Sequence, residues 1–261
     1  MYSEKYLLKR LKKYRYYTQE SNEVSFTYEF NTTELKNLQQ RQGLAQFGNE
    51  KTFESMVKVM HNVFDKLYIE DLQKDTNIIT NFASDYIFDM ADTKKYRFSC
   101  WVYATTLTEC FLSLGIPARM IRCLSGLFFD RDCHCVTIAY CEEYKKYVLF
   151  DVANNTVYYS SKGIPLSLPE LRDCIIDNKR IIVLQSEIGE KQGLIDYWIK
   201  NMILFQCYEK SRYGNELNIS DNRIVFLAPA NLRFYSKPFL ANKNYQAILT
   251  RCDDEFWMLP H

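Results

Sequence analysis

The chain has 261 residues, of which 47% are hydrophobic, and its 33 basic side chains nearly balance 32 acidic ones. A chain of this length can bury the core of one large domain or of two modest ones. The formal net charge of +1 excludes the strong global field by which a basic protein attracts nucleic acid or an anionic membrane. We therefore expect neither a nucleic-acid partner nor membrane association.

The first residues predict a cytoplasmic protein that starts with a basic helix. The stretch "MYSEKYLLKRLKKYRYY" carries charges and tyrosines where a signal peptide needs an uninterrupted apolar run, and no later run approaches a membrane span. The nine cysteines are odd in number and scattered, which is typical of a reducing compartment. Apolar residues recur at helical spacing, so we expect a docked helix with a solvated basic face or, as an alternative, a contact surface for an acidic partner.

Residues 1–95 are predicted to form a mainly helical N-terminal layer. The alternation in "EVSFTYEF" favours one strand, and "NTTELKNL" places capping residues ahead of a helix. The stretch "KTFESMVKVMHNVFDKLY" predicts a long helix with a single apolar face, made of Phe53, Met56, Val57, Met60, Val63 and Phe64.

Residues 96–160 predict a helix followed by three short strands. Ser99 can cap a helix that ends at Gly115, ahead of Pro117, and whose apolar stripe contains Ala104, Leu107, Phe111 and Leu114. The stretches "ARMIRCL", "HCVTIAYC" and "KYVLFDVA" then favour strands, the last two joined by the polar turn "EEYKK". We expect a small antiparallel sheet with the helix packed on it.

Residues 161–261 are expected to add helices and strands that complete this sheet. The stretch "SLPELRDCII" begins with a serine cap and a proline in the first turn, and "KQGLIDYWIKNMILFQCYEK" predicts a long amphipathic helix. Strand character returns in "RIVFLAP", "YQAILTRC" and "EFWMLP". Since no repeat or low-complexity linker divides the chain, we predict a single α+β domain over residues 1–261, with a split near Lys95 as the less favoured alternative.

Cys100 is the candidate nucleophile because it lies in the first turn of its predicted helix. The partial positive charge of a helix N-terminus lowers the pKa of a thiol toward the range in which it reacts. Of the three histidines, His61 lies within a helix and His261 ends the chain, so His134, which opens a strand, is the expected base. The backbone N–H of Cys100 is a natural oxyanion donor, and Trp101 is the neighbouring candidate for oxyanion or substrate contact.

The strand period of two allows Asp151 to orient His134. If Cys141 pairs with Lys146 across a four-residue turn, His134 lies one pleat from Asp151 on the same face of the sheet. If Cys141 pairs with Tyr144 instead, imidazole and carboxylate lie directly opposite each other. Both registers bring the two groups together, whereas a turn with an odd number of residues separates them.

The order Cys, His, Asp within "SCWVYATTLTECFLSLGIPARMI", "CHCVTIAY" and "YVLFDVANN" resembles the transglutaminase-like superfamily of the papain-type cysteine fold, and in particular its bacterial-type members. The spacings of 34 residues from Cys100 to His134 and 17 from His134 to Asp151 are similar to those of the family's core. The sequence departs from the family pattern at Ser99, where glycine is frequent, in lacking a tryptophan after His134, and in having "DVANN" in place of Asp-Pro-Thr. The resemblance implies a papain-like α+β core in which the cysteine helix packs on an antiparallel sheet.

The three residues and the resemblance together imply a cysteine-dependent amide-bond hydrolase, a peptidase or amidase, that acts through a thioester acyl-enzyme. Its expected substrate is a peptide, a protein or a small amide, and no cofactor is expected. Transfer to an amine acceptor, as in a transglutaminase, is one alternative. A non-catalytic peptide-binding or scaffold module on the same fold is another.

Two further sets of residues, the cysteines around His134 and two arginines, could bind a metal ion or a substrate. Thiolates and imidazole in "CHC" suit zinc, but no C-x-x-C pair exists and neighbouring strand residues point apart, so we expect no metal site. Arg119 or Arg122 could hold a substrate carboxylate, although arginines in such positions more often bridge loop carbonyls or stay solvated. The cysteines expected to be core thiols are Cys110, Cys123, Cys135, Cys141, Cys174, Cys207 and Cys252.

Overall fold

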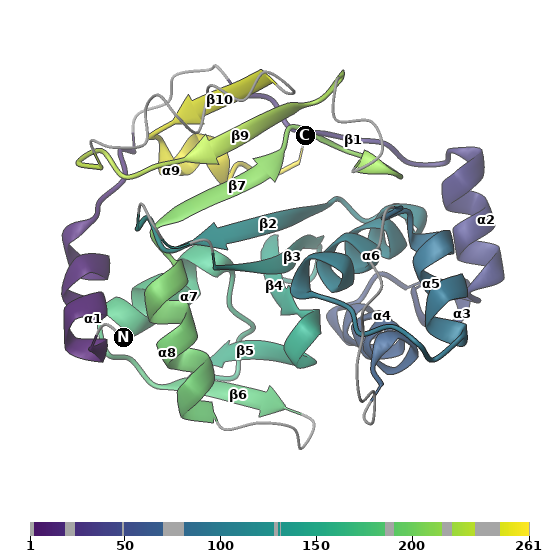
Figure 1. Cartoon of the computed structure of the whole chain (residues 1–261), viewed down its shortest axis with the longest axis horizontal. Helices are drawn as coiled ribbons and strands as arrows, with labels where there is room; N and C mark the ends of the chain where they lie inside the picture. Colours follow the sequence, from purple (N-terminus) through teal and green to yellow (C-terminus); the bar gives the residue numbers. More distant parts are fainter. Residues whose placement is uncertain are drawn as a thin grey trace.

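A mixed sheet of eight strands runs through the middle of the molecule, with helices gathered at its two sides (Figure 1). The computed structural model describes residues 3–18, 24–48, 50–69, 81–127, 130, 132–185, 191–215, 221–232 and 246–260. The strand order is β10-β9-β7-β2-β3-β4-β5-β6, and all neighbours are antiparallel except β9 and β10. The protein is therefore of mixed α and β structure, but its sheet is larger than the small antiparallel one predicted.

The strands of the large sheet are β2 (Ala118–Leu124), β3 (Cys133–Cys141), β4 (Lys146–Asp151), β5 (Thr156–Ser160), β6 (Ile181–Gln185), β7 (Leu204–Tyr208), β9 (Arg223–Leu227) and β10 (Gln246–Thr250). Two short strands, β1 (Thr27–Tyr28) and β8 (Lys210–Ser211), form a separate parallel pair. The helices are α1 (Glu4–Lys13), α2 (Thr33–Arg41), α3 (Ala45–Gly48), α4 (Phe53–Leu67), α5 (Ser84–Asp92), α6 (Cys100–Ser113), α7 (Leu168–Ile176), α8 (Lys191–Asn201) and α9 (Asp253–Phe256), with a 3₁₀ turn η1 (Val152–Asn154) after β4.

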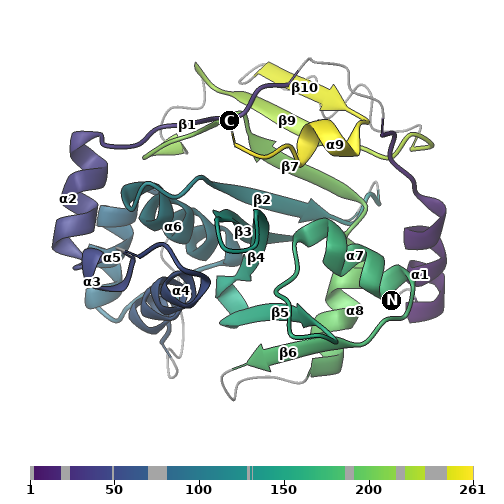
Figure 2. The ribbon, with the colours of Figure 1, turned by 180° about the vertical axis from the view of Figure 1, so that it is seen from behind.

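The two faces of the sheet carry separate apolar cores, because successive strand residues point to opposite faces. In β3, Ala139 and Cys141 belong to the core shared with helices α2 to α6. Val136 and Ile138, which alternate with them, belong to the core shared with α1, α7 and α8. Figure 2 shows these two helical groups from behind, on opposite sides of the strands.

Helix α6 begins and ends close to the predicted residues. Ser99 occupies the N-cap position with an extended backbone, but its side chain makes no capping hydrogen bond. At the other end, the N–H of Ile116 donates to the Phe111 carbonyl and that of Gly115 to the Leu112 carbonyl, both at 2.9 Å, while Gly115 has φ +68. This is a Schellman motif, which requires a left-handed residue and thus favours glycine.

The predicted amphipathic character of α6 is wrong. All of residues 102–112 are buried, because the side of the helix that faces away from the sheet is covered by α2, α4 and α5. Those helices supply the N-terminal layer that was predicted over residues 1–95. The nucleophile candidate is therefore presented by a helix that is fixed on all sides.

The hairpin of β3 and β4 has the first of the two predicted registers. Cys141 pairs with Lys146 and Thr137 with Phe150 across a four-residue turn. Lys145 in that turn has φ 53, which is the left-handed conformation that a tight turn requires.

The C-terminal third departs most from the predicted elements. The helix predicted through Lys210 ends at Asn201, and the following apolar residues form β7, which pairs with β2 and buries Phe205. The stretch predicted as the strand "EFWMLP" instead overlaps α9, whose first turn is acidic and therefore suits a helix N-terminus. Strands β5 and β6 were not predicted. The strand predicted from Tyr245 corresponds to β10. Tyr245 itself and His261 lie outside the described residues.

Helix α1 is docked on the second core, as one of its two interpretations predicts. Leu11 is fully buried, and the guanidinium of Arg172 donates to the carbonyl oxygens of Leu11 and Tyr14 at 3.1 and 2.8 Å. Within the part of the chain that the structure describes, no helix combines the length and the apolar character that crossing a membrane would take.

Candidate active site

Strand β3 extends beyond the end of β4 at the point where the candidate residues meet. The two strands pair only as far as Thr137, and β4 ends at Asp151. Residues 133–136 of β3 are paired with β2 alone, so their other edge is open. The first turn of α6 reaches this edge, where Sγ of Cys100 lies 3.8 Å from the carbonyl oxygen of Cys133.

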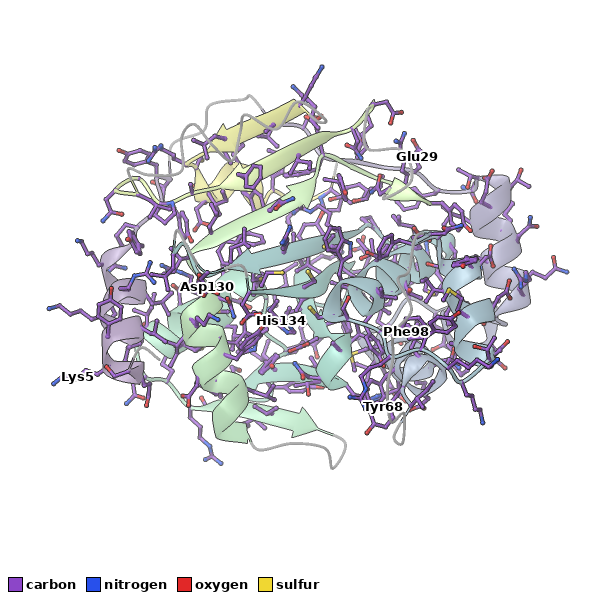
Figure 3. All side chains as sticks on the ribbon, in the orientation of Figure 1. Lys5, Glu29, Tyr68, Phe98, Asp130 and His134 are labelled. Atoms are coloured by element: carbon purple, nitrogen blue, oxygen red, sulfur yellow. The ribbon has the colours of Figure 1, made fainter. Side chains whose placement is uncertain are left out.

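Cys100, His134 and Asp151 form one connected group. Nε2 of His134 lies 2.9 Å from Oδ1 of Asp151, and the side chains of His134 and Cys100 are hydrogen-bonded to each other. Because Nε2 faces the carboxylate, Nδ1 is the ring nitrogen left for the sulfur. Asp151 is fully buried, His134 is 4% exposed and Cys100 is half-buried. Figure 3 labels His134 near the centre of the molecule, beside α8.

Two further hydrogen bonds hold the carboxylate of Asp151. Its Oδ2 accepts from the hydroxyl of Tyr158 at 3.0 Å and from the amide of Asn154 at 2.9 Å. The indole N–H of Trp198 donates in turn to the Tyr158 hydroxyl at 2.8 Å. With both oxygens engaged, Asp151 has a fixed orientation toward His134.

Aromatic rings from α8 enclose the imidazole. The rings of Trp198 and Tyr197 stand edge-on to His134, with centroids 5.0 and 5.3 Å from it. The Tyr197 hydroxyl donates to the carbonyl oxygen of Cys133 at 3.0 Å, which fixes the start of β3. The sequence alone predicts no site role for these residues. Tyr197 and Trp198 lie in the stretch "DYW" of a predicted helix, and no nearby residue in the sequence connects that helix to His134.

Asn154 was also missed, although it lies in a stretch that had been noted as a departure from the family pattern. It follows Asp151 by three residues, and the 3₁₀ turn η1 brings its side chain back to the carboxylate. The stretch "DVANN" thus contributes a side-chain amide to the site, which a reading of the triad alone did not consider.

The environment favours an ion pair of thiolate and imidazolium. The hydrogen bond with Cys135 is the largest influence on the pKa of Cys100; burial opposes it, and the hydrogen bond and charge of His134 add to it, so that the pKa falls to about 4. Burial would lower the pKa of His134, but the charge and hydrogen bond of Asp151, followed by Cys100, raise it to about 10. At neutral pH the sulfur therefore carries a negative charge and the ring a positive one.

The side chain of Cys135 is buried, as predicted for a core thiol, and it also interacts with the sulfurs of Cys100 and Cys133. Both interactions are hydrogen bonds between side chains. These two interactions, followed by burial, raise the pKa of Cys135 well above its ordinary value, so it stays a thiol that can donate. The hydrogen bond from Cys135, with the charge of Arg122, lowers the pKa of Cys133 to about 6 in spite of burial.

The two arginines that could have held a substrate carboxylate have different surroundings. Arg119 is fully buried, with its guanidinium 3.9 Å from the ring centroid of Phe26 and its Nη1 donating to the carbonyl oxygen of Phe256 at 2.9 Å. It is therefore a structural residue, and the substrate interpretation is wrong for it. The guanidinium of Arg122 lies on the α6 side of the sheet, 5.3 Å from the ring centroid of Trp101.

Trp101 packs beside the candidate nucleophile through its indole ring. The ring is stacked on Phe82, with centroids 6.1 Å apart, and it also receives the guanidinium of Arg122. The structure thus shows Trp101 packed between Phe82 and Arg122, directly after Cys100 in the chain. Its part in an oxyanion site stays a prediction.

The cysteines considered for zinc lie on different faces of the sheet. Cys123 belongs to the core on the α7 and α8 side, whereas Cys141 belongs to the core beneath α6. Within the described ranges, no group of three or more His, Cys, Asp and Glu side chains is arranged to hold a metal ion.

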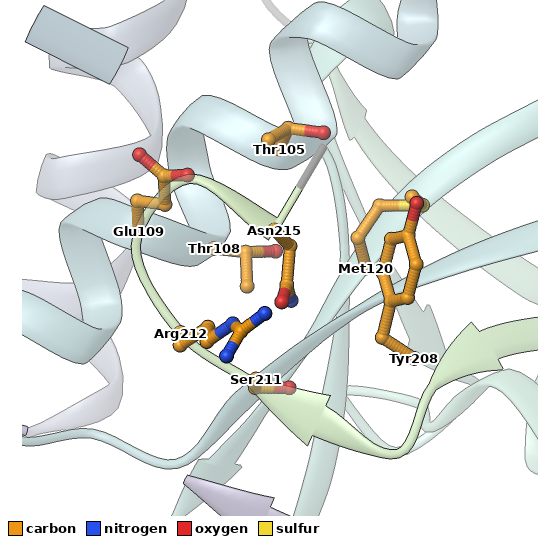
Figure 4. Close-up of a pocket in the computed structure, with 8 residues that line it drawn as sticks. All are labelled: Thr105, Thr108, Glu109, Met120, Tyr208, Ser211, Arg212 and Asn215. Atoms are coloured by element: carbon orange, nitrogen blue, oxygen red, sulfur yellow. The ribbon is translucent and has the colours of Figure 1, made fainter. Parts of the chain in front are cut away.

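A small pocket farther along α6 is separate from this group (Figure 4). Thr105, one helical turn beyond Trp101, lines it together with Glu109, whose carboxylate accepts from Ser84 and from the N–H of Gly214. The candidate triad does not line it; the residues that do are Thr105, Thr108, Glu109, Met120, Tyr208, Ser211, Arg212 and Asn215.

No protein-family model matches the chain, and neither a curated protein nor a solved structure matches it. The resemblance to the transglutaminase-like superfamily is thus carried by the motifs alone. Function has to be inferred from the chemistry of the site.

Proposed function

We propose that the chain is a cysteine-dependent amide-bond hydrolase, a peptidase or amidase, on a papain-like core of the transglutaminase-like kind. The observation that carries the proposal is a buried chain of hydrogen bonds that ends on a thiol at the start of a helix. Its members are, in order, Trp198, Tyr158, Asp151, His134 and Cys100. A cysteine that only fills space gains nothing from such a chain, whereas a nucleophile gains a persistent thiolate.

Acylation starts from the thiolate and imidazolium pair. The sulfur of Cys100 attacks the amide carbonyl carbon, and negative charge develops on the carbonyl oxygen. The N–H groups of the first turn of α6 have no partners within the helix, so that of Cys100 is placed to stabilise this charge. When the C–N bond breaks, Nδ1 of His134 gives its proton to the leaving amine, and a thioester on Cys100 remains.

In deacylation the same groups exchange roles, with His134 as the base and Cys100 as the leaving group. Neutral His134 takes a proton from water as the water oxygen attacks the thioester carbon, and the Cys100 thiolate leaves. Asp151 stabilises the imidazolium that forms again, and its other hydrogen bonds keep it in place throughout. An amine in place of water would complete an acyl transfer by the same steps.

The test is to trap the acyl-enzyme. The protein is incubated with a pool of N-acylated peptide p-nitroanilides and quenched in acid, and the modified residue is identified by peptide mass spectrometry. We expect an acyl adduct on Cys100 that is absent from Cys100→Ala. Cys174→Ala is the matched control, because Cys174 is also half-buried but lies on α7, and this variant should keep the adduct.

A different result would favour the binding module. If no member of the pool acylates Cys100 while iodoacetamide still alkylates it readily, the thiolate exists without the proposed chemistry. Acylation of Cys174 and Cys100 to the same extent would mean that the pool reacts with any accessible thiol, and the proposal would fail.

A further inference from the structure

We infer that Arg122 anchors a carboxylate on the molecule that Cys100 attacks, so that the site selects acidic amides over neutral ones. The inference takes its substrate, an amide, from the proposed function. The position of the guanidinium over the ring of Trp101, the residue after Cys100, does not depend on that function.

The fold brings Arg122 to the nucleophile from a neighbouring strand. In β2 it stands between two partner strands, opposite Cys135 of β3 and Gln206 of β7. Its guanidinium is held against the face of Trp101, the residue next to Cys100, and is hydrogen-bonded to the side chain of Cys133. The cation is therefore fixed within the group of side chains that surrounds the reactive sulfur.

The charge of Arg122 has no carboxylate partner among the described residues. Its Nε is buried without a hydrogen-bond partner, and no ion pair joins it to an Asp or Glu of the described segments. Lys200, a cation of α8, is in contrast paired with both Asp130 and Asp132, at 3.1 and 2.7 Å. The charge of Arg122 is balanced instead by the sulfurs of Cys133, Cys135 and Cys100, which leave the buried Nε without a hydrogen-bond acceptor, and a bound carboxylate would supply one.

The chemistry of the guanidinium selects the ligand. A cation stacked on an aromatic face keeps its edge available for hydrogen bonds in its own plane. Two parallel N–H groups at that edge match the two oxygens of a carboxylate. A carboxylate close to the attacked carbon would therefore lie against Arg122 while the carbon faces Cys100.

Two alkylating reagents test this without knowledge of the natural substrate. Iodoacetate and iodoacetamide have the same leaving group, but only iodoacetate places a carboxylate next to the attacked carbon. The ratio of their rate constants at Cys100, measured by peptide mass spectrometry, is independent of the thiolate fraction, because that fraction affects both reagents equally. We expect Arg122→Gln to lower the ratio of iodoacetate to iodoacetamide about tenfold, the size of one hydrogen-bonded charge pair, and Arg122→Lys to lower it less.

Lys200→Met is the matched control for loss of one positive charge. Its cation is already balanced by two aspartates, so the ratio should stay within about twofold of the wild-type value. An unchanged ratio in Arg122→Gln, or equal losses in Arg122→Gln and Lys200→Met, would overturn the inference.

The wild-type protein provides a measurement that does not depend on folding of a variant. The ratio at Cys100 should exceed that of free glutathione, and a ratio at or below that of glutathione would contradict the inference. Failure of the proposed function looks different: the ratio then falls in Arg122→Gln as expected, but no acyl adduct forms on Cys100. Acyl adducts with an unchanged ratio would remove the anchor and leave the hydrolase.

Discussion

Three side chains of this site form hydrogen bonds with the carboxylate of Asp151. It is fully buried and receives hydrogen bonds from His134, Tyr158 and Asn154. Removing such a group from water is costly unless its hydrogen-bonding capacity is filled, and here three donors fill it. The negative charge so maintained raises the pKa of His134, and the imidazolium in turn helps to keep Cys100 ionised.

Cys135 is predicted to tune the nucleophile. Its hydrogen bond is the largest contribution that lowers the pKa of Cys100, so Cys135→Ala should raise that pKa. At about pH 5 the rate of iodoacetamide labelling at Cys100 should fall about tenfold as the thiolate fraction drops. Cys141→Ala is the matched control, because Cys141 is equally buried on the same face of β3 but is not hydrogen-bonded to Cys100. Equal effects of the two substitutions would show that the change comes from lost packing.

At the scale of elements, the site depends on where α6 begins. Ser99 leaves its first turn without a side-chain cap, and the helix is held by its neighbours instead. One such contact is made by Glu109, which accepts hydrogen bonds from the N–H and hydroxyl of Ser84 at the start of α5 and from the N–H of Gly214. Glu109 thus caps α5 from another helix, which explains why Ala83 suffices at the N-cap position of α5.

Glu109→Gln tests this connection between helices. Because both carboxylate oxygens accept, the NH2 group of the new amide would oppose the donors of Ser84 or the N–H of Gly214. We therefore expect the free energy of unfolding in urea to fall by about 1–3 kcal/mol. Ser84→Ala removes only the hydroxyl hydrogen bond and should cost about 1 kcal/mol. If Glu109→Gln unfolds at the same urea concentration as the wild type, the carboxylate does not hold the two helices together.

Elements with local signals were predicted well, and elements defined by partners were not. The end of α6 at Gly115 and the register of the hairpin from Cys141 to Lys146 follow from turn chemistry and strand period. The boundary between α8 and β7 does not, because the apolar run after Asn201 fits either a buried helix or a strand. Only pairing with β2, a partner distant in sequence, decides for the strand.

At the scale of the whole molecule, Arg119 joins distant parts of the chain. Its guanidinium lies 3.9, 4.8 and 5.9 Å from the ring centroids of Phe26, Tyr147 and Phe256, which come from the N-terminal third, β4 and α9. Its Nη1 also donates to the carbonyl oxygen of Phe256. A fully buried side chain in such a position stabilises by packing as well as by charge.

Arg119→Ala should lower the free energy of unfolding by about 3–5 kcal/mol, because it leaves a cavity between three aromatic rings. Arg119→Met keeps most of the volume and should cost about half as much. Urea denaturation followed by tyrosine and tryptophan fluorescence measures both. Equal costs would indicate that the cation contributes and the volume does not.

The candidate site contains residues that the local sequence predicts and residues that only the folded sheet brings together. Cys100, His134 and Asp151 could be predicted because they lie within one continuous stretch of sequence. The spacing of the three residues and the period of two in the strands can be recognised there without knowledge of the fold. Tyr158 and Trp198 come from β5 and α8, so their contacts exist only once the larger sheet has formed. The role of Arg122 could not be predicted either, because it depends on the fold. Arg122 and Arg119 lie on opposite faces of β2, so that one contacts Trp101 and the other Phe26.

The pH dependence of iodoacetamide labelling at Cys100 tests the central claim most directly. Since the pKa of Cys100 is lowered from 9.0 to about 4, the thiolate is lost only as the pH falls through the lower value. The labelling rate should therefore be nearly constant from about pH 5 to about pH 8, and His134→Gln should move its midpoint upward. A wild-type midpoint in the range of an ordinary thiol, or one that His134→Gln leaves in place, would contradict the account.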